Sequence, residues 1–205
     1  MILFKKILKW AGVVIVGALI LLVIVRAFHF YNLDKTNAVV EKIHATKLTL
    51  SDVLGENLPP DPGAEADKTI AGIDANNNGI RDDVEIAIFK AYPNSAKKRA
   101  VALQYAMALQ NQTIQPTLNK DIVIATIQEE DRAGSCVGDI FYRNDDNEQV
   151  MKKYFKDSDG LRSFIKNQQL NTLERKKYRT SFYEYLDSYS SLDHYCDIDY
   201  STLPN

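Results

Sequence analysis

The chain lacks the signatures of the common nucleic-acid-binding and enzyme classes. Its net charge of −2 is close to zero, and no basic stretch with interleaved aromatic residues is present. Nucleic-acid-binding proteins usually carry such a basic surface, so we expect no nucleic-acid partner. There is no H-E-x-x-H, no phosphate-binding Walker loop and no dinucleotide-binding glycine pattern. The sequence therefore indicates a protein that is not an enzyme.

Segments with the alternating pattern of β-strands are scarce beyond residue 63. Apolar residues recur instead at spacings of three and four, which is typical of helices that bury one face. Capping residues and prolines set the expected helix limits. The sequence predicts a mostly α-helical domain, with helices at 82–92, from Asn94 or Ser95 to Pro116, and from Asn119 to about Tyr142, a short helix capped by Ser158 or Asp159, and a last helix from Thr172 to Tyr189.

Cysteine is rare, with only Cys136 and Cys196 in the chain. Two cysteines in an exported protein most simply form a disulfide, which here would close a loop of about 61 residues. Two free thiols remain the alternative. The pattern GSCVG around Cys136 resembles a nucleophile elbow, but an elbow needs a preceding strand, and the residues before it are helical in pattern. We therefore expect a structural disulfide.

Long apolar stretches are confined to one place, the run WAGVVIVGALILLVIV at residues 10–25. Flanking residues extend this run to 8–30, which is enough for a transmembrane helix of about 20 residues. Three lysines precede the run and one arginine lies near its far end, which places the N-terminus in the cytoplasm and exports the rest. A cleaved signal peptide is the alternative, although the run is longer than the apolar region of most signal peptides.

The remaining chain divides at a proline-rich segment, NLPPDPG at residues 57–63. Its three prolines fix backbone angles and remove hydrogen-bond donors, which rules out regular structure there. The expected organisation is a cytoplasmic tip and anchor at 1–30, a stalk at 31–62 and an exported helical domain at 63–205.

The stretch DANNNGIRDDVE, residues 74–85, has oxygen-bearing side chains at the spacing of a calcium-binding loop. With Asp74 as position 1, side-chain oxygens fall at positions 1, 3, 5, 9 and 12, and a glycine at position 6 allows the sharp turn. Calcium prefers six to eight oxygen ligands. The alternative is an Asn-Gly turn in which Asp82 and Asp83 favour the helix start through its dipole. The expected ligands are Asp74, Asn76, Asn78, the backbone carbonyl of Ile80, Asp82 and Glu85.

This spacing resembles the EF-hand-like calcium loops of exported bacterial proteins and is close to the thrombospondin type 3 form DxDxDGxxDxxE. The segment LPPDPG at 58–63 is also similar to that of a family of bacterial envelope proteins, in which it precedes such a loop. The resemblance implies Ca²⁺ as the bound ion. With the topology above, it implies a single-pass protein of the bacterial inner membrane with its C-terminal domain in the periplasm.

Two residues depart from the pattern of EF-hands that pair with one another. Position 8, which is aliphatic in such pairs, is Arg81, and Gly72 interrupts any helix that would lead into the loop. We therefore expect a single loop followed by one helix. Asparagine at positions 3 and 5 lowers the charge of the ligand set and favours weak binding, on the order of 10⁻⁴ to 10⁻³ M, as in extracellular modules.

These patterns favour a membrane-anchored periplasmic protein that binds calcium for structural reasons and acts as an interaction module of the cell envelope. Its contacts would be the membrane, through residues 8–30, and an unidentified envelope protein. Two other functions remain open: a periplasmic inhibitor or immunity protein that binds a toxin or enzyme, and an enzyme whose site is built from residues without a recognisable motif.

Overall fold

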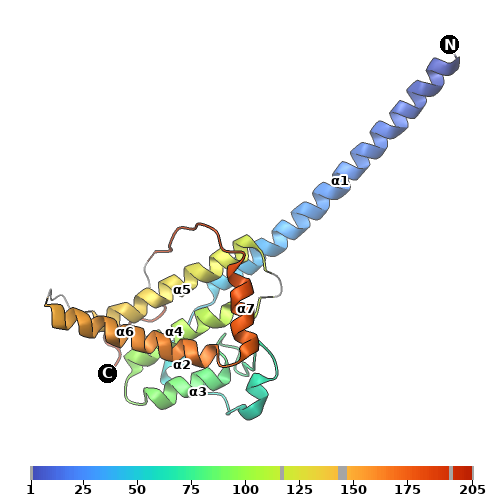
Figure 1. Ribbon diagram of the computed structural model, residues 1–205. Helices are drawn as coiled ribbons and strands as arrows, with labels where there is room; N and C mark the ends of the chain where they lie inside the picture. The colour runs from blue at the N-terminus through green and yellow to red at the C-terminus, as the bar shows by residue number, and fades with distance from the viewer. Residues whose placement is uncertain (1, 116–117, 143–146, 194–195, 205) are drawn as a thin grey trace. The chain divides into compact units, whose positions relative to one another are not determined.

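A computed structural model describes residues 2–115, 118–142, 147–193 and 196–204 of the chain (Figure 1). These residues form α-helices, two short 3-10 helices and connecting loops, and they contain no β-strand. The expected mostly α-helical fold class is therefore confirmed. The chain divides into two compact units, Met1–Glu41 and Lys42–Asn205.

Helix α1, Ile2–Ala45, carries the apolar run of the first unit. It is the one helix within the described residues that is long and apolar enough to cross a membrane. Every side chain between residues 10 and 25 is exposed, and none packs into a core. An exposed apolar surface of this length favours an apolar environment, so the helix is able to associate with a membrane.

The second unit begins at Lys42, whereas the sequence predicted a stalk that extends to residue 62. Ile43, Leu48 and Val53 are all buried. Helix α2, Leu50–Leu54, is capped by Thr49, and Leu48 and Val53 belong to the main core. The predicted boundary at 63 is wrong because prolines exclude regular structure without excluding packing, and Pro59 itself is buried.

Helix α4, Ala96–Asn111, forms the centre of the second unit. Every residue from Arg99 to Asn111 is buried. Helices α2, α3 (Asp82–Ala91), α5 (Lys120–Phe141) and α6 (Glu148–Gln169) all contact it, and Figure 1 shows α5 and α6 crossing near it. A helix that is buried all round belongs to a core, and the many alanines of α4 let its neighbours approach closely.

The capping residues Ser95, Asn119 and Thr172 are confirmed, because each side chain accepts a backbone N–H of the first turn that follows. Helix α5 continues without a break through Gly134 and Gly138, as its bounds show. The short helix predicted to begin at Ser158 or Asp159 is instead the second half of α6, which begins after Asn147.

Helix α7, Leu173–Tyr183, is shorter than predicted. The chain leaves the helix after Tyr183, yet Leu186 and Tyr189 still pack against a small core cluster that contains Phe182. Of the apolar and aromatic residues of this segment, Phe182 is fully buried, whereas Leu173 and Tyr185 are exposed, so the sequence overstated both the length and the burial of this helix. The 3-10 helices η1, Gly63–Asp67, and η2, Tyr200–Thr202, complete the described elements.

Candidate functional site

The loop 74–85 leads directly into α3, and no helix precedes it between residues 68 and 81. Gly79 lies in the left-handed region with φ +82°, and Asn77 does so with φ +58°. A glycine has no Cβ to oppose such a backbone, and asparagine tolerates it better than most residues. The described backbone is a loop followed by one helix, α3, and its identity as an EF-hand-like calcium loop stays a prediction.

The carboxylate of Asp74 holds the tip of the loop together. Its Oδ1 accepts the N–H of Asn78 at 3.1 Å, and its Oδ2 accepts the N–H of Gly79 at 2.9 Å. The next turn is closed by Asn78 itself, whose Oδ1 accepts the N–H of Ile80 at 2.9 Å. The oxygens of positions 1 and 5 thus lie inside the loop, and Ile80 is completely buried beneath it.

Asp82 and Glu85 bring two further carboxylates to this loop from the first turn of α3. Asp82 accepts the N–H of Ala75 at 3.0 Å, and Glu85 Oε2 accepts the side-chain amide of Asn76 at 3.1 Å. Both acidic side chains are buried, at 1% and 0% exposure. Hydrogen bonds therefore tie positions 1, 9 and 12 to other parts of the loop, and the role of these positions as metal ligands stays a prediction.

Two buried polar atoms in this cluster, Glu85 Oε1 and Asn78 Nδ2, make no hydrogen bond of good geometry within the described residues, although the side chain of Asn78 lies close enough to Glu85 to lower its pKa. A buried carboxylate oxygen without a partner costs about 1–3 kcal/mol, and more when it is charged. Burial raises the pKa of Glu85 to about 7, since the charged form is poorly solvated there. Burial also raises the pKa of Asp82, and the neighbouring carboxylates of Asp74 and Asp83 add to this effect.

No three His, Cys, Asp or Glu side chains come together in a metal-holding group within the described parts of the chain. The loop instead combines three carboxylates with two amides and a backbone carbonyl. This donor chemistry fits a hard cation such as calcium and does not fit zinc, which prefers nitrogen and sulfur. Asn76 donates its amide N–H to Glu85, and its Oδ1 accepts the N–H of Asn78 at 3.4 Å within the loop.

Arg81, which departs from the EF-hand pattern, is completely buried and links the loop to α6. Its guanidinium donates to the carbonyl oxygens of Gln168 at 2.7 Å and Gln169 at 3.1 Å, and it also pairs with Asp83. These carbonyls belong to the C-terminal end of α6, where helix carbonyls need partners. The side chain of Arg81 lies where a Cβ at Gly72 would be, which explains the glycine at that position.

A second buried arginine, Arg175, fixes the segment that leads into the loop. Its guanidinium donates to the carbonyl oxygens of Ala66 at 2.6 Å, Thr69 at 3.0 Å and Ile70 at 3.0 Å. It also pairs with Asp67, and this contact lowers the pKa of the Asp67 carboxyl. No sequence pattern indicates this role, because the carbonyls that Arg175 binds lie more than a hundred residues away in the chain.

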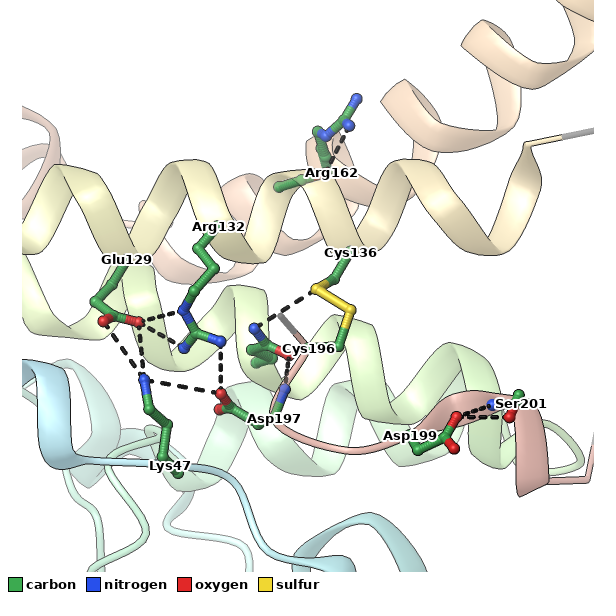
Figure 2. Close-up of a disulfide and its surroundings, with 11 residues drawn as sticks. Lys47, Glu129, Arg132, Cys136, Arg162, Cys196, Asp197, Asp199 and Ser201 are labelled. Carbon is green, nitrogen blue, oxygen red and sulfur yellow. Dashed lines mark hydrogen bonds and ion pairs between the residues drawn. A yellow bond between two sulfur atoms is a disulfide. The ribbon is translucent and has the colours of Figure 1, made fainter. Parts of the chain in front are cut away.

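The predicted disulfide between Cys136 and Cys196 is present, with Cα atoms 5.7 Å apart (Figure 2). It joins the C-terminal third of α5 to the C-terminal segment. Cys136 is a helical residue and is completely buried, so the nucleophile-elbow interpretation is excluded by both its backbone and its bonding. Gln104 of α4 lies beside the bond and donates from Nε2 to Cys136 Sγ at 3.8 Å.

A network of buried charges adjoins the disulfide (Figure 2). The side chain of Asp197 is fully buried, pairs with Arg132 at 2.7 Å and accepts the N–H of Leu48 at 3.0 Å. Arg132 also binds Glu129, and Glu129 in turn accepts from His44 Nδ1 at 2.9 Å. The network therefore joins the end of α1, α5 and the C-terminal segment, and the sequence did not predict it.

Acid should weaken this network. Burial raises the pKa of Glu129, but hydrogen bonds from His44 and Arg132 and the charges of Arg132 and Lys47 outweigh it, so the pKa is lowered overall. A carboxyl with a lowered folded pKa contributes stability above its unfolded pKa of about 4.3 and loses it as the pH falls through the folded value. We expect the free energy of unfolding to fall on acidification below about pH 4.3.

Urea unfolding of the full chain in uncharged detergent, measured from about pH 6 to about pH 3, checks this expectation. Glu129→Gln should reduce the loss of stability over this range, because it removes one carboxyl whose pKa is lowered by folding. Asp197, which shares Arg132 and Lys47 with Glu129, is retained in the variant. An equal loss of stability in wild type and variant would contradict the role given to Glu129.

Comparison with models of protein families, with curated proteins and with solved structures finds no match to this chain.

Proposed function

We propose that the protein is a membrane-anchored calcium-binding module of the cell envelope, in which Ca²⁺ has a structural role. The observation that carries the proposal is the buried oxygen cluster of loop 74–85. The charge of Asp74 raises the pKa of Asp82, and the charge of Asp82 raises the pKa of Glu85. None of these three carboxylates forms an ion pair within the described residues, since Arg81 is directed at Asp83 and the end of α6. A divalent cation would neutralise most of this charge and supply the partner that Glu85 Oε1 needs.

The ligands expected for this ion are those given by the spacing. Asp74, Asp82 and Glu85 would supply charge, Asn76 and Asn78 amide oxygens, and Ile80 its backbone carbonyl. Glu85 suits a two-oxygen contact because, within the described residues, its side chain is approached only by the amides of Asn76 and Asn78 and by no cation.

A stabilising role is favoured over a switching role by the connections of the loop. Asn76 donates to the carbonyl of Asn57 at 3.0 Å, and Arg81 binds the end of α6. The loop thus joins the proline-rich segment, α3 and α6. A calcium switch of the EF-hand type opens a pair of helices, and this loop has only its exit helix. Bound calcium would hold these three parts of the domain in place.

A calcium titration tests the proposal. Isothermal titration of the full chain in uncharged detergent should give one site with a dissociation constant on the order of 10⁻⁴ to 10⁻³ M. Magnesium should bind more weakly, because it is smaller and gives up its waters reluctantly. Glu85→Gln should abolish binding, and Glu56→Gln, an exposed residue outside the loop, should leave it unchanged. Absence of calcium binding in the wild type would refute the proposal.

The membrane topology forms part of the same proposal. Three lysines precede the apolar run of α1, which favours a cytoplasmic N-terminus and a periplasmic second unit. Alkaline phosphatase is active only after export, so its fusion after Asn205 should be active in a bacterial host. Moving the three lysines to the other side of the run should reduce that activity. An inactive fusion to the wild-type chain would place the second unit in the cytoplasm.

A further inference from the structure

A second candidate site lies away from the calcium loop, where the start of α4, the end of α5 and the first half of α6 meet. The cavity there has a volume of about 330 Å³. This is within the range of about 300–1,000 Å³ found for small-molecule sites. Its lining is formed by Ser95, Lys97, Lys98, Ile140, Phe141, Val150, Lys153, Tyr154 and Asp157.

The charge of the lining is positive. Three lysines face one aspartate, and none of these lysines forms an ion pair with an acidic side chain in the described part of the chain. Lys152, one residue before Lys153 but outside the cavity, does pair, with Glu148 at 2.5 Å. The cavity therefore concentrates cations whose charge is not balanced by described carboxylates, and an anion would be attracted to it.

Lys98 is held at the cavity by aromatic rings. Its ammonium lies 5.8 Å from the ring centre of Tyr92 and 5.9 Å from that of Phe141. Such cation–π contacts favour a position over the ring faces and limit the freedom of a long side chain. Lys97 and Lys98 also belong to the first turn of α4, where the helix dipole adds to the positive potential.

The rest of the lining is apolar or aromatic. Ile140, Phe141 and Val150 provide aliphatic and ring surface, and Tyr154 packs edge-on against Tyr142 with ring centres 5.9 Å apart. The phenol of Tyr154 reaches α5 at Gly138, where an added Cβ would lie 3.0 Å from its oxygen. A fully hydrated inorganic ion would leave this surface unused, so an apolar group on the ligand is favoured.

We propose that this cavity binds a small organic anion, a carboxylate or phosphate ester that carries an aromatic or short aliphatic group. The anionic group contacts Lys97, Lys98 and Lys153, and the apolar group lies against Phe141 and Tyr154. The proposal is independent of calcium, because the residues of the loop and those of the cavity do not overlap.

Phenyl phosphate is a suitable probe, because it combines a phosphate with one aromatic ring. Isothermal titration of the full chain in uncharged detergent should show binding at one site. The double variant Lys98→Gln/Lys153→Gln should bind at least tenfold more weakly. Lys176→Gln/Lys177→Gln, which removes the same charge from exposed positions of α7, should bind as the wild type does. Inorganic phosphate should bind at least tenfold more weakly than phenyl phosphate.

Each other outcome would overturn the proposal in a recognisable way. Equal binding of the two phosphates would show that the aromatic lining has no role. Equal losses in the two double variants would show that net charge alone attracts the anion. Failure of phenyl phosphate to bind, including the case in which an acidic peptide does bind, would show that the cavity is not a site for small organic anions.

Discussion

Replacing Cys136 and Cys196 together by alanine is expected to lower the free energy of unfolding by about 4 kcal/mol. The bond joins positions separated by 60 residues, and the loss follows from the greater freedom of the unfolded chain. Cys196 also precedes Asp197, whose carboxylate pairs with Arg132 at 2.7 Å. Without the disulfide, the segment 196–204 would be held to the rest of the domain only by non-covalent contacts such as this ion pair.

Urea unfolding of the full chain in uncharged detergent measures this loss. Wild type under oxidising conditions is compared with the Cys136→Ala/Cys196→Ala variant, and wild type with added reductant serves as the matched control. The reduced wild type should approach the variant in stability, although two alanines leave slightly more empty space than two thiols. A variant within about 1 kcal/mol of the oxidised wild type would contradict the stabilising role of the bond.

Calcium at about 100 times its dissociation constant is expected to stabilise the second unit by about 2.7 kcal/mol. Glu85→Gln should remove most of this gain, because it takes away a buried carboxylate of the ligand set. The same variant should be more stable than wild type when calcium is chelated, since an uncharged amide is less costly to bury than an unpaired carboxylate. A variant that only damaged the fold would be less stable in both conditions, and it would not gain stability in chelator.

Asp74→Asn should also reduce the calcium gain, but it should not stabilise the chelated protein. Its carboxylate accepts two backbone N–H groups of the loop, at 3.1 and 2.9 Å, and the amide would replace only one of these acceptors. Asp83 is unsuitable as a neutral control, because it pairs with the buried Arg81. The exposed Glu56 provides the better control, with the same charge change outside the loop.

Helix limits set by local chemistry could be predicted from the sequence. Ser95, Asn119 and Thr172 cap helices through hydrogen bonds to residues three positions away, so the signal lies within one turn. Ser158 has the same appearance in the sequence, but its hydroxyl bonds to the carbonyl of Phe155 inside α6. A local pattern cannot distinguish a capping serine from a serine inside a helix when the residues before it can also form a helix.

The residues of loop 74–85 could be singled out in the sequence because the calcium ligands proposed here would follow a fixed spacing in the chain. The two arginines that position the loop could not. Arg81 and Arg175 bind backbone carbonyls that lie 87 to 109 residues away, and carbonyls carry no sequence identity. The burial of Ile43, Leu48 and Val53 also could not be predicted from local sequence. It depends on the other parts of the domain that pack against this segment, and these lie far away in the chain.

Thermal unfolding of the full chain in uncharged detergent, with calcium or with chelator, tests the central claim most directly. The wild type should unfold about 5–10 °C higher in calcium than in chelator, given a gain of about 2.7 kcal/mol in a domain of this size. Glu85→Gln should show little difference between the two conditions, and Glu56→Gln should behave as the wild type. Magnesium at the same concentration controls for ionic strength. Equal melting temperatures of the wild type in calcium and in chelator would contradict the account and leave loop 74–85 as a turn that begins α3.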